Sequence, residues 1–360
     1  MAETVPMLEL TVDEHDVIRG AEEVLKAIRP HWRCDSIRFK LFTDGITNKL
    51  VGCFNQNNNR SDGEGDFDAD ASSAGEVVLV RVYGNKTDLL IDRKKETENI
   101  QLLHRYGYAP SLYATFRNGL AYEYVPGVTL TPESCREERV WRLVAKRMAQ
   151  MHKVEQPGSS KQPMLREKLN QFLKLVPQIF SDPVKHTRIS KIFPNVTELR
   201  RDFDELYGKL SQLASPVVFC HNDLLLGNVI YNAERDRVTF IDYEYAAYNH
   251  QAFDIGNHFT EFAGIDEIDY NRYPGKEFQL RWLKVYLDEF TGSRGTDSDV
   301  ERLYVQVNQF ALASHFLWTI WALIQAEHST IAFDFIQFAE NRYREYLRRR
   351  AEFLALTYQN

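Results

Sequence analysis

The chain has 360 residues, of which 44% are hydrophobic and 12% aromatic, which suffices for a sizeable core in about two domains. A net charge of −7 argues against a protein that binds nucleic acids or anionic membranes in a general way. The four cysteines are scattered and form no metal-like pair, and residues 1–4 lack the basic start of a signal peptide, so we expect a cytoplasmic protein with reduced thiols.

The first part of the chain predicts a helix followed by a hairpin. Apolar residues at helical spacing predict an amphipathic helix within residues 11–30. Strands are predicted at 37–42 and 50–54, on either side of the turn 43–49. Small side chains and free backbone N–H groups make this turn a candidate phosphate cradle, although one glycine in a hairpin is usually only a turn. The candidate phosphate-binding residues are Gly45, Thr47, Asn48 and Lys49.

A second candidate for nucleotide binding follows a polar segment. Residues 55–75 are mainly Asn, Ser, Asp and Gly and predict a disordered loop. Arg81 lies near the end of a predicted strand, 76–83, where kinases place the lysine that grips the nucleotide phosphates. A guanidinium suits phosphate because it donates two parallel hydrogen bonds. In the helix predicted at 89–106, Glu96 is the candidate partner of Arg81, although a solvated arginine and a surface glutamate are the alternatives.

A hairpin predicted at 112–116 and 120–125 ends in Tyr-Glu-Tyr-Val-Pro-Gly. This ending is typical of a hinge between two lobes, where backbone groups would contact an adenine edge. We therefore expect a nucleotide-binding lobe at 1–125 and a catalytic, substrate-binding lobe at 126–360. The candidate hinge contacts are Glu123 and Val125.

Beyond the hinge the hydrophobic pattern becomes helical. Helices are predicted at 141–152 and 199–210, and the second leads to an apolar strand at Val217. The methionines and tryptophan of the first helix form one stripe, which we interpret as core.

The segment 217–231 reads as two apolar strands joined by a polar loop. In the loop, Asp223 follows a histidine by two positions and precedes Asn228 by five, the spacing of a kinase catalytic loop. A third strand delivers Asp242 and then Glu244. Magnesium prefers carboxylate, amide and phosphate oxygens, so Asn228, Asp242 and Glu244 are candidate ligands. Each residue alone is an ordinary turn former, but their order predicts phosphoryl transfer from ATP to a small alcohol, with Asp223 catalytic.

Two carboxylates follow on the next predicted helix. Asp254 lies near its start and is expected to brace the catalytic loop rather than to react. Glu261 lies seven residues later, on the same helical face, and could direct a carboxylate toward the substrate.

The last third of the chain predicts two helices. Residues 310–326 are apolar but too short and too polar for a membrane span, so we expect a buried helix and no stable membrane insertion. Trp318 and Trp321 share one face of it; paired indoles are usually core, but they could also form a wall for a cationic substrate. The helix that carries Arg342 is rich in arginine and predicts a solvated face.

Taken together, these motifs resemble the choline/ethanolamine kinase family, and most closely its ethanolamine branch. The resemblance extends over about residues 37–350. It rests on the segments 218–228, 241–259 and 308–316, and the segment 83–88 matches the ethanolamine branch.

The resemblance implies an α+β, bilobal, protein-kinase-like fold, with a β-rich N-terminal lobe and a mainly helical C-terminal lobe that carries short catalytic hairpins. It implies the use of ATP with Mg²⁺ to phosphorylate ethanolamine, the first step of phosphatidylethanolamine synthesis by the CDP-ethanolamine route. It also makes Trp318, Trp321 and Phe333 expected walls of an ammonium pocket, with Glu261 as the countercharge.

Two departures from choline kinases bear on the amine. Residues 262–265 lack the Trp and Tyr that follow the glutamate in choline kinases, and Phe338 stands where family members often carry Tyr. Choline relies on aromatic faces, whereas the primary ammonium of ethanolamine has three N–H donors that carboxylates or water can accept. The sequence therefore favours ethanolamine.

Three alternatives stay open. The nearest is a choline kinase or a dual-specificity kinase, and a more distant one is an antibiotic or sugar-amine phosphotransferase. The third is a catalytically inactive kinase-like scaffold. The expected partners are ATP and an amino alcohol, with no nucleic acid, and the sequence leaves open whether the chain forms a homodimer.

Overall fold

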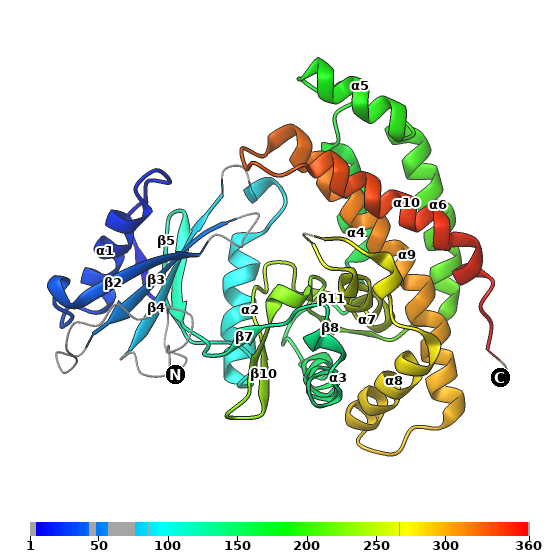
Figure 1. Ribbon diagram of the computed structural model, residues 1–360, viewed down its shortest axis with the longest axis horizontal. Coiled ribbons are helices and arrows are strands. Elements are labelled where there is room, and N and C mark those ends of the chain that lie inside the picture. Colours follow the sequence, from blue (N-terminus) through cyan, green and yellow to red (C-terminus); the bar gives the residue numbers. More distant parts are fainter. Residues whose placement is uncertain (1–4, 43–47, 57–75, 85–86, 266, 359–360) are drawn as a thin grey trace. The chain divides into compact units, whose positions relative to one another are not determined.

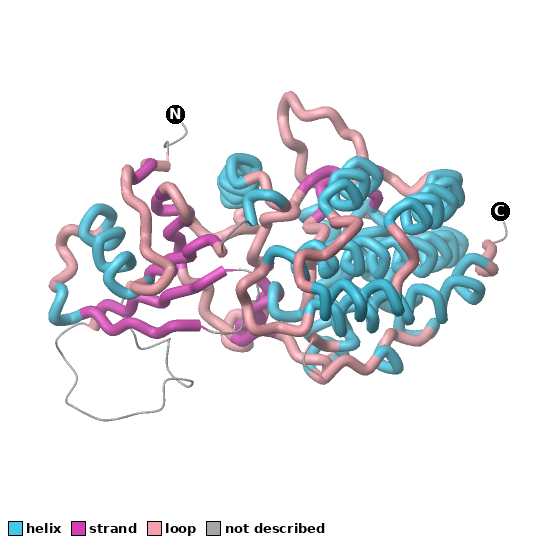
Figure 2. Tube along the Cα trace, turned by 90° about the horizontal axis from the view of Figure 1, so that it is seen from above, coloured by secondary structure: helices cyan, strands magenta, loops and turns pink. Residues whose placement is uncertain are grey.

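The computed structural model of the chain describes residues 5–42, 48–56, 76–84, 87–265 and 267–358. Backbone contacts divide the chain into two units, Met1–Gly127 and Val128–Asn360, here called the N-terminal unit and the C-terminal unit. Figure 2 distinguishes them by colour, since strands dominate the first and helices the second.

A six-stranded sheet forms the centre of the N-terminal unit, in the order β1-β5-β6-β4-β3-β2 (Figure 1). Neighbouring strands are antiparallel, except that β1 runs parallel to β5. The strands are β1 (Met7–Leu8), β2 (Ile37–Phe42), β3 (Asn48–Asn55), β4 (Val77–Tyr83), β5 (Leu112–Phe116) and β6 (Gly119–Glu123). All except β1 lie where the sequence predicts strands. Because β3 runs through Asn55, it includes the first residue of the predicted loop, and 57–75 lies outside the described residues.

The first helix, α1 (Val17–Ile28), covers the sheet and packs against β3 and β4. It is shorter than the predicted 11–30 because Val12 does not continue the helix but packs against it. A Cβ added to Gly20 would lie 2.2 Å from Cγ1 of Val12, so the extended segment fits here only against a glycine. The buried residues of α1 are Val17, Gly20, Ala21, Val24 and Leu25.

The second helix, α2 (Arg93–Arg105), begins four residues later than predicted. A separate 3₁₀ turn, Thr87–Leu89, precedes it. Asp92 then caps α2, because its side chain accepts a hydrogen bond of 3.1 Å from the backbone N–H of Lys95. This cap fixes the first turn of α2, which carries Glu96.

The C-terminal unit is mainly helical and holds two small strand groups. One is a three-stranded sheet in the order β10-β9-β7, and the other pairs β8 with β11. The strands are β7 (Val128–Thr129), β8 (Val217–Cys220), β9 (Val229–Asn232), β10 (Arg237–Phe240) and β11 (Ala247–His250). The helices are α3 (Glu138–His152), α4 (Leu165–Leu175), α5 (Pro183–Ile192), α6 (Val196–Leu210), α7 (Gln251–Thr260), α8 (Lys276–Thr291), α9 (Asp297–His328) and α10 (Phe335–Leu354). The α+β class predicted from the sequence is confirmed.

The core of the C-terminal unit is built around α9, which packs against α4, α6, α7, α8 and α10 (Figure 1). It has 32 residues, far more than the predicted 310–326, and begins with a capping box formed by Thr296 and Asp299. Every residue from Val305 to Ala326 is buried. By length and composition α9 is the one helix in the described part of the chain that could cross a membrane, but its apolar stretch is entirely covered by protein.

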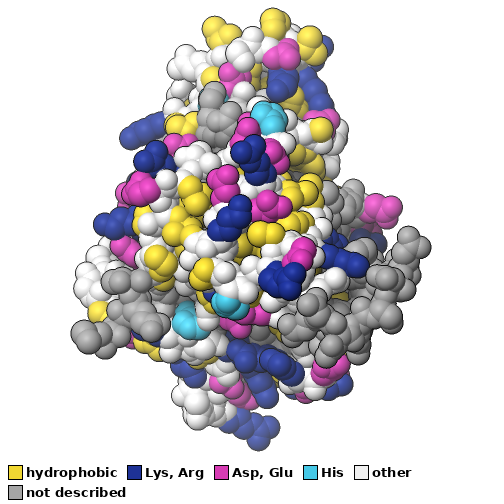
Figure 3. Space-filling model, turned by 90° about the vertical axis from the view of Figure 1, so that its left-hand side faces the viewer, with side chains coloured by type: hydrophobic (Ala, Val, Ile, Leu, Met, Phe, Trp, Pro, Cys, Tyr) yellow, Lys and Arg dark blue, Asp and Glu magenta, His cyan; other side chains and the backbone are white. Residues whose placement is uncertain are grey.

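One face of the molecule (Figure 3) mixes side-chain types among the described residues. On the face shown in Figure 3, acidic, basic and hydrophobic side chains are interspersed among the described residues. This agrees with a chain in which 44 lysines and arginines accompany 51 aspartates and glutamates.

Candidate active site

The catalytic loop predicted from the sequence connects β8 to β9. Its sharp first turn depends on Asn222, which adopts a left-handed backbone conformation with φ +67°. The buried Asn222 side chain holds this turn, since its Nδ2 donates to the carbonyl of Tyr245 at 2.9 Å and its Oδ1 accepts from Nδ2 of Asn249 at 2.8 Å. These bonds tie the loop to the segment between β10 and α7.

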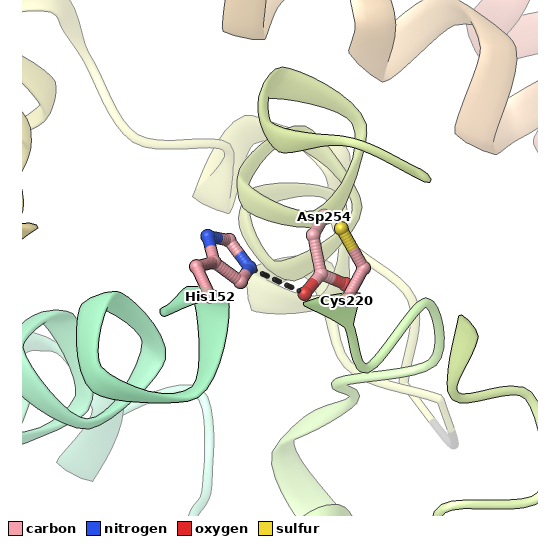
Figure 4. A group of neighbouring side chains, drawn as sticks. All are labelled: His152, Cys220 and Asp254. Carbon is pink, nitrogen blue, oxygen red and sulfur yellow. Dashed lines mark hydrogen bonds and ion pairs between the residues drawn. The ribbon is translucent and has the colours of Figure 1, made fainter. Parts of the chain in front are cut away.

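Asp254 of α7 stabilises the same turn through hydrogen bonds. Its Oδ2 accepts from the backbone N–H of His221 at 2.9 Å, and its Oδ1 accepts from the N–H of Asn222 at 2.6 Å. His152, at the end of α3, lies 2.9 Å from Oδ2 through its Nε2, and Figure 4 shows this contact. Burial opposes ionisation of Asp254, but the bonds from His152 and His221 lower its pKa below the usual range.

The thiol of Cys220 lies beside this brace (Figure 4), and burial raises its pKa well above the usual range. Although Cys220, His152 and Asp254 present ligand atoms within 4.8 Å of one another, the carboxylate is already occupied by loop N–H groups. We interpret the group as the support of the catalytic loop, as expected for Asp254.

His221 is an uncharged residue that stabilises the loop through hydrogen bonds. Its Nδ1 accepts from the backbone N–H of Asp223 at 3.3 Å, so the proton is assigned to Nε2, which lies 2.9 Å from the carbonyl of Ile241. Burial lowers the pKa of His221, which keeps the ring uncharged. The side chain therefore links the catalytic loop to the end of β10, and Asp223 stays the predicted proton acceptor of this loop.

Asn228 ties the loop to the end of β10, just before Asp242. Its Nδ2 donates to the carbonyl of Asp223 at 2.8 Å, which leaves its Oδ1 as the atom that can bind a cation. Its backbone carbonyl accepts from the N–H of Ile241 at 3.0 Å. Asp242 comes next with φ +63°, a conformation that costs a residue with a Cβ about 1–2 kcal/mol. Backbone strain of this kind often accumulates at functional positions.

Asp223 lies among several negative charges. Burial and the negative charges of Asp242, Glu244 and Glu261 raise the pKa of Asp223 well above its usual range, whereas Arg342 opposes this rise. Several carboxylates thus compete for the same small region. A divalent cation between the Asn228 oxygen and these acids would relieve the repulsion, so the donor set fits the predicted Mg²⁺ site.

An aromatic cluster contains the three residues predicted to contact an ammonium group. Trp318 meets Trp321 edge to face, with ring centroids 5.6 Å apart, and Phe333 belongs to the same cluster through Phe335, at 4.9 Å. The sequence did not reveal Tyr245, whose ring lies 5.4 Å from Trp318 and whose hydroxyl accepts from the indole N–H of Trp321 at 3.0 Å. The members are Tyr245, Trp318, Trp321, Phe333, Phe335 and Phe338.

A buried polar network fixes the orientation of this cluster. The Oδ1 of Asn257 accepts from the indole N–H of Trp318 at 2.7 Å and from the hydroxyl of Ser314 at 2.8 Å. Since Asn257 lies on α7 and both donors lie on α9, the network locks the two helices together. The indole ring of Trp318 is thereby held in one position.

Glu261 does not stand alone as a countercharge. It begins a short 3₁₀ turn, Glu261–Ala263, directly after α7 and forms an ion pair with Arg342 of α10. Arg342 also donates to the hydroxyl of Thr260 at 3.1 Å. The prediction that Arg342 lies on a solvated face is wrong, because only 4% of Arg342 is exposed. The partner of Arg342 is distant in the sequence, so composition alone suggested a surface residue.

In the N-terminal unit, Arg81 of β4 forms the predicted ion pair with Glu96 of α2, and both side chains are buried. Gly45 and Thr47 lie outside the described residues. Asn48 begins β3 opposite Tyr83, and the ammonium of Lys49 donates to the carbonyl of Glu14. Binding of a nucleotide by these residues stays a prediction.

At the expected hinge, Glu123 ends β6. Its side chain accepts from the backbone N–H of Ser111 at 3.0 Å, and its backbone N–H donates to the Ser111 carbonyl at 2.9 Å. Val125 follows, partly buried. Their contact with adenine likewise stays a prediction.

Comparison with known proteins identifies relatives of the whole chain. The family model described as choline/ethanolamine kinase matches residues 39–347. An ethanolamine kinase of Drosophila melanogaster is 50% identical, with 98% of this chain and 81% of that protein covered. Ethanolamine kinase 2 of Homo sapiens is 47% identical, with 99% and 87% covered. The solved structure of a Plasmodium vivax ethanolamine kinase superposes with a TM-score of 0.79 at 26% identity, covering 93% of this chain and 89% of that one.

Proposed function

The chain belongs to the choline/ethanolamine kinase family, and from that premise we propose that it transfers the γ-phosphoryl group of ATP to the hydroxyl of ethanolamine. The product, phosphoethanolamine, would enter phosphatidylethanolamine synthesis by the CDP-ethanolamine route. The use of Mg²⁺ and a cytoplasmic location are part of the same proposal.

The observation that carries this proposal is the hydrogen-bonded unit formed by the catalytic loop and the end of β10. Asn228 bonds to the carbonyl of Asp223 through its side chain and to Ile241, the residue before Asp242, through its backbone, so the catalytic loop is fixed to the end of β10. Phosphoryl transfer depends mainly on positioning and on neutralising charge, which a rigid unit of this kind provides.

In this reaction Asp223 orients the ethanolamine hydroxyl and accepts its proton. The hydroxyl oxygen forms the new bond to the γ-phosphorus while the bond to the bridging oxygen breaks, and ADP leaves with the electron pair. Asn228, Asp242 and Glu244 would hold Mg²⁺, which supplies positive charge to the phosphate oxygens when it is bound. Arg81, steadied by Glu96, is the proposed phosphate contact of the N-terminal unit.

The amine is proposed to bind at the aromatic cluster of the C-terminal unit. Aromatic faces attract a cation by up to about 2 kcal/mol when water is excluded, and Trp318 and Trp321 are almost completely buried. This feature would also suit the quaternary ammonium of choline, so choline is the second candidate substrate. Phe338 carries no hydroxyl, and the ammonium of ethanolamine can donate to carboxylates or water instead.

The direct test compares wild type with Asp223→Ala and measures ADP formation in the presence of ethanolamine. We expect turnover to fall by about 100-fold to 10,000-fold. Turnover of the variant within tenfold of wild type would overturn the assignment of Asp223. ATP consumption that does not depend on an added amine would favour the scaffold alternative.

A second assay would establish the amine. Ethanolamine, monomethylethanolamine, dimethylethanolamine and choline are compared in parallel as phosphate acceptors. We expect kcat/KM to decrease with each added methyl group, because each one removes an N–H donor. A higher kcat/KM for choline than for ethanolamine would assign the chain to choline.

A further inference from the structure

Arg342 contacts the aromatic cluster that is proposed to bind the amine. The Cζ atom of its guanidinium lies over the ring of Phe338, a member of that cluster, at 5.2 Å from the ring centroid. Its NH2 bonds to Oε1 of Glu261, and its NH1 donates to the hydroxyl of Thr260 at 3.1 Å. A resident cation therefore lies against one of the rings that would attract the cationic end of a substrate.

The carboxylate of Glu261 is engaged through one oxygen. Oε1 accepts from Arg342, and the hydroxyl of Thr260 lies 3.4 Å from the same atom. Within the described part of the chain, Oε2 receives no hydrogen bond. Glu261 is only 5% exposed, so this oxygen has little contact with water. An N–H donor on a bound ligand would satisfy it.

The Arg342–Glu261 pair lies near both ends of the proposed substrate site. Both charges act on Asp223, because Glu261 raises its pKa and Arg342 lowers it. The guanidinium also contacts Phe338 and, through this ring, the cluster that contains Trp321. An ammonium group bound at these rings would therefore have a hydrogen-bond acceptor within the same site.

Pairing with Arg342 changes how Glu261 can attract an amine. An unpaired carboxylate attracts any cation, whether or not the cation carries N–H groups. A carboxylate with a balanced charge attracts mainly through the hydrogen bond that its remaining oxygen accepts. Ethanolamine has three N–H donors for this bond, and choline has none. Choline would leave the buried oxygen unpaired, and a site that loses a hydrogen bond in this way rejects the analogue strongly.

We propose that Arg342 is a positioning residue that sets the amine specificity, acting through Glu261 and Phe338 to favour an ammonium with N–H groups over a quaternary one. It balances the charge of Glu261, so that the carboxylate serves as a hydrogen-bond acceptor. It also lies over the Phe338 ring, which would otherwise offer an aromatic face to a quaternary ammonium. This inference rests on the proposed function, since it assumes that the amine binds at the aromatic cluster.

The test measures kcat/KM for ethanolamine and for choline at saturating MgATP, together with the unfolding midpoint of each variant. In Arg342→Met, we expect the ratio of ethanolamine to choline to fall about tenfold, mainly through a lower KM for choline. The reason is that Glu261 becomes an unpaired countercharge and Phe338 is uncovered. Arg342→Lys keeps the charge and should hold the ratio within about threefold of wild type. The matched control is Arg344→Met, which removes an arginine that is 74% exposed on the same helix and should not change the ratio.

Glu261→Gln tests the acceptor independently and decides the question if Arg342→Met does not fold. Arg342 would retain the amide oxygen of the glutamine, which leaves an NH2 group where Oε2 now lies. The unbalanced charge of Arg342 repels both ammonium groups alike, so it cancels in the ratio of the two amines. Because only ethanolamine loses a hydrogen bond, we expect the ratio to fall by at least about tenfold.

A ratio that stays within about threefold of wild type in Arg342→Met, with turnover of both amines reduced alike, would overturn the inference, since Arg342 would then be purely structural. An unchanged ratio in Glu261→Gln would also overturn it, because Glu261 would then act as a general countercharge. A wild-type protein that phosphorylates neither amine, or that prefers choline, would contradict the proposed function itself and the inference with it.

Discussion

Arg342 and Glu261 are 81 positions apart in the sequence, yet they form an ion pair that is almost completely shielded from water. The pair connects α10 to the end of α7 at the site that contains Asp223. The negative charge of Glu261 is therefore balanced within the protein. Its second oxygen, rather than a free negative charge, is what it can offer to an N–H donor.

Loss of Arg342 should be costly because it would leave Glu261 buried without its partner. We expect Arg342→Met to reduce the free energy of unfolding by about 3–5 kcal/mol, measured by urea denaturation. The double variant Arg342→Met/Glu261→Gln should recover most of this loss, since both charges are gone. Arg344→Met is the control, because Arg344 is 74% exposed on the same helix. Equal losses in the single and double variants would contradict the pairing argument.

The brace formed by Asp254 should control turnover. An asparagine has only one acceptor oxygen, so Asp254→Asn leaves either the His221 N–H or the Asn222 N–H without its present acceptor. A lost hydrogen bond to a charged group is worth about 1.5–3 kcal/mol, and we expect kcat to fall by about 10-fold to 100-fold. Asp182→Asn, which keeps an N-cap on α5, should not alter kcat. A normal kcat in Asp254→Asn would show that the loop holds its shape without the brace.

The raised pKa of Asp223 predicts a conflict between activity and stability. Since the folded protein binds this proton more tightly than the unfolded chain, the contribution of Asp223 to stability decreases as pH rises from its ordinary range through the raised pKa. Asp223→Asn removes this cost, so we expect a higher unfolding midpoint at pH 7 together with at least about 100-fold lower kcat. The gain in stability should disappear as the pH approaches about 4. A variant less stable than wild type at pH 7 would contradict this account.

The same raised pKa predicts how activity depends on pH and on magnesium. Asp223 must be ionised to accept a proton, so kcat should decrease as pH falls through its pKa. A cation bound by Asn228 and Asp242 would favour the ionised form, so a higher Mg²⁺ concentration should move the acid limb to lower pH. The measurement is the pH profile of kcat at limiting and saturating Mg²⁺. An acid limb that stays in place would argue against these two ligands.

Close approach of α7 and α9 should make Gly256 sensitive to any added side chain. A Cβ at this position would lie 2.7 Å from the carbonyl oxygen of Val307, on the backbone of α9. We expect Gly256→Ala to lower the free energy of unfolding by about 1–3 kcal/mol, measured by urea denaturation. Gly208→Ala in α6 faces open space and should instead raise it by about 0.5–1 kcal/mol. The same sign for both variants would contradict the packing argument.

Local sequence patterns predicted the catalytic loop well because its residues are close together in the chain. The strands before and after Asp223 alternate with turn residues, and the structure has β8, β9 and β10 at these places. In contrast, β1 has only two residues and pairs with the distant β5, so periodicity could not indicate it.

Buried polar residues explain most of the remaining differences. The apolar composition of α9 begins only at Phe310, but the buried part of the helix begins earlier. Gln306, Asn308 and Gln309 are buried because they form hydrogen bonds to distant groups. The burial of Arg342 was not predicted for the same reason, since only the fold brings its partner Glu261 near. Sequence composition describes a side chain but not its partner.

The long central helix has a consequence for synthesis of the protein. During synthesis, α9 leaves the ribosome before α10. Until α10 follows, the side of α9 that α10 later covers is exposed to water or to a nearby membrane. Chaperone binding or membrane mistargeting would then compete with productive assembly. We expect translation stopped between Ser329 and Asp334 to yield an insoluble nascent chain, whereas translation through Leu354 rescues solubility.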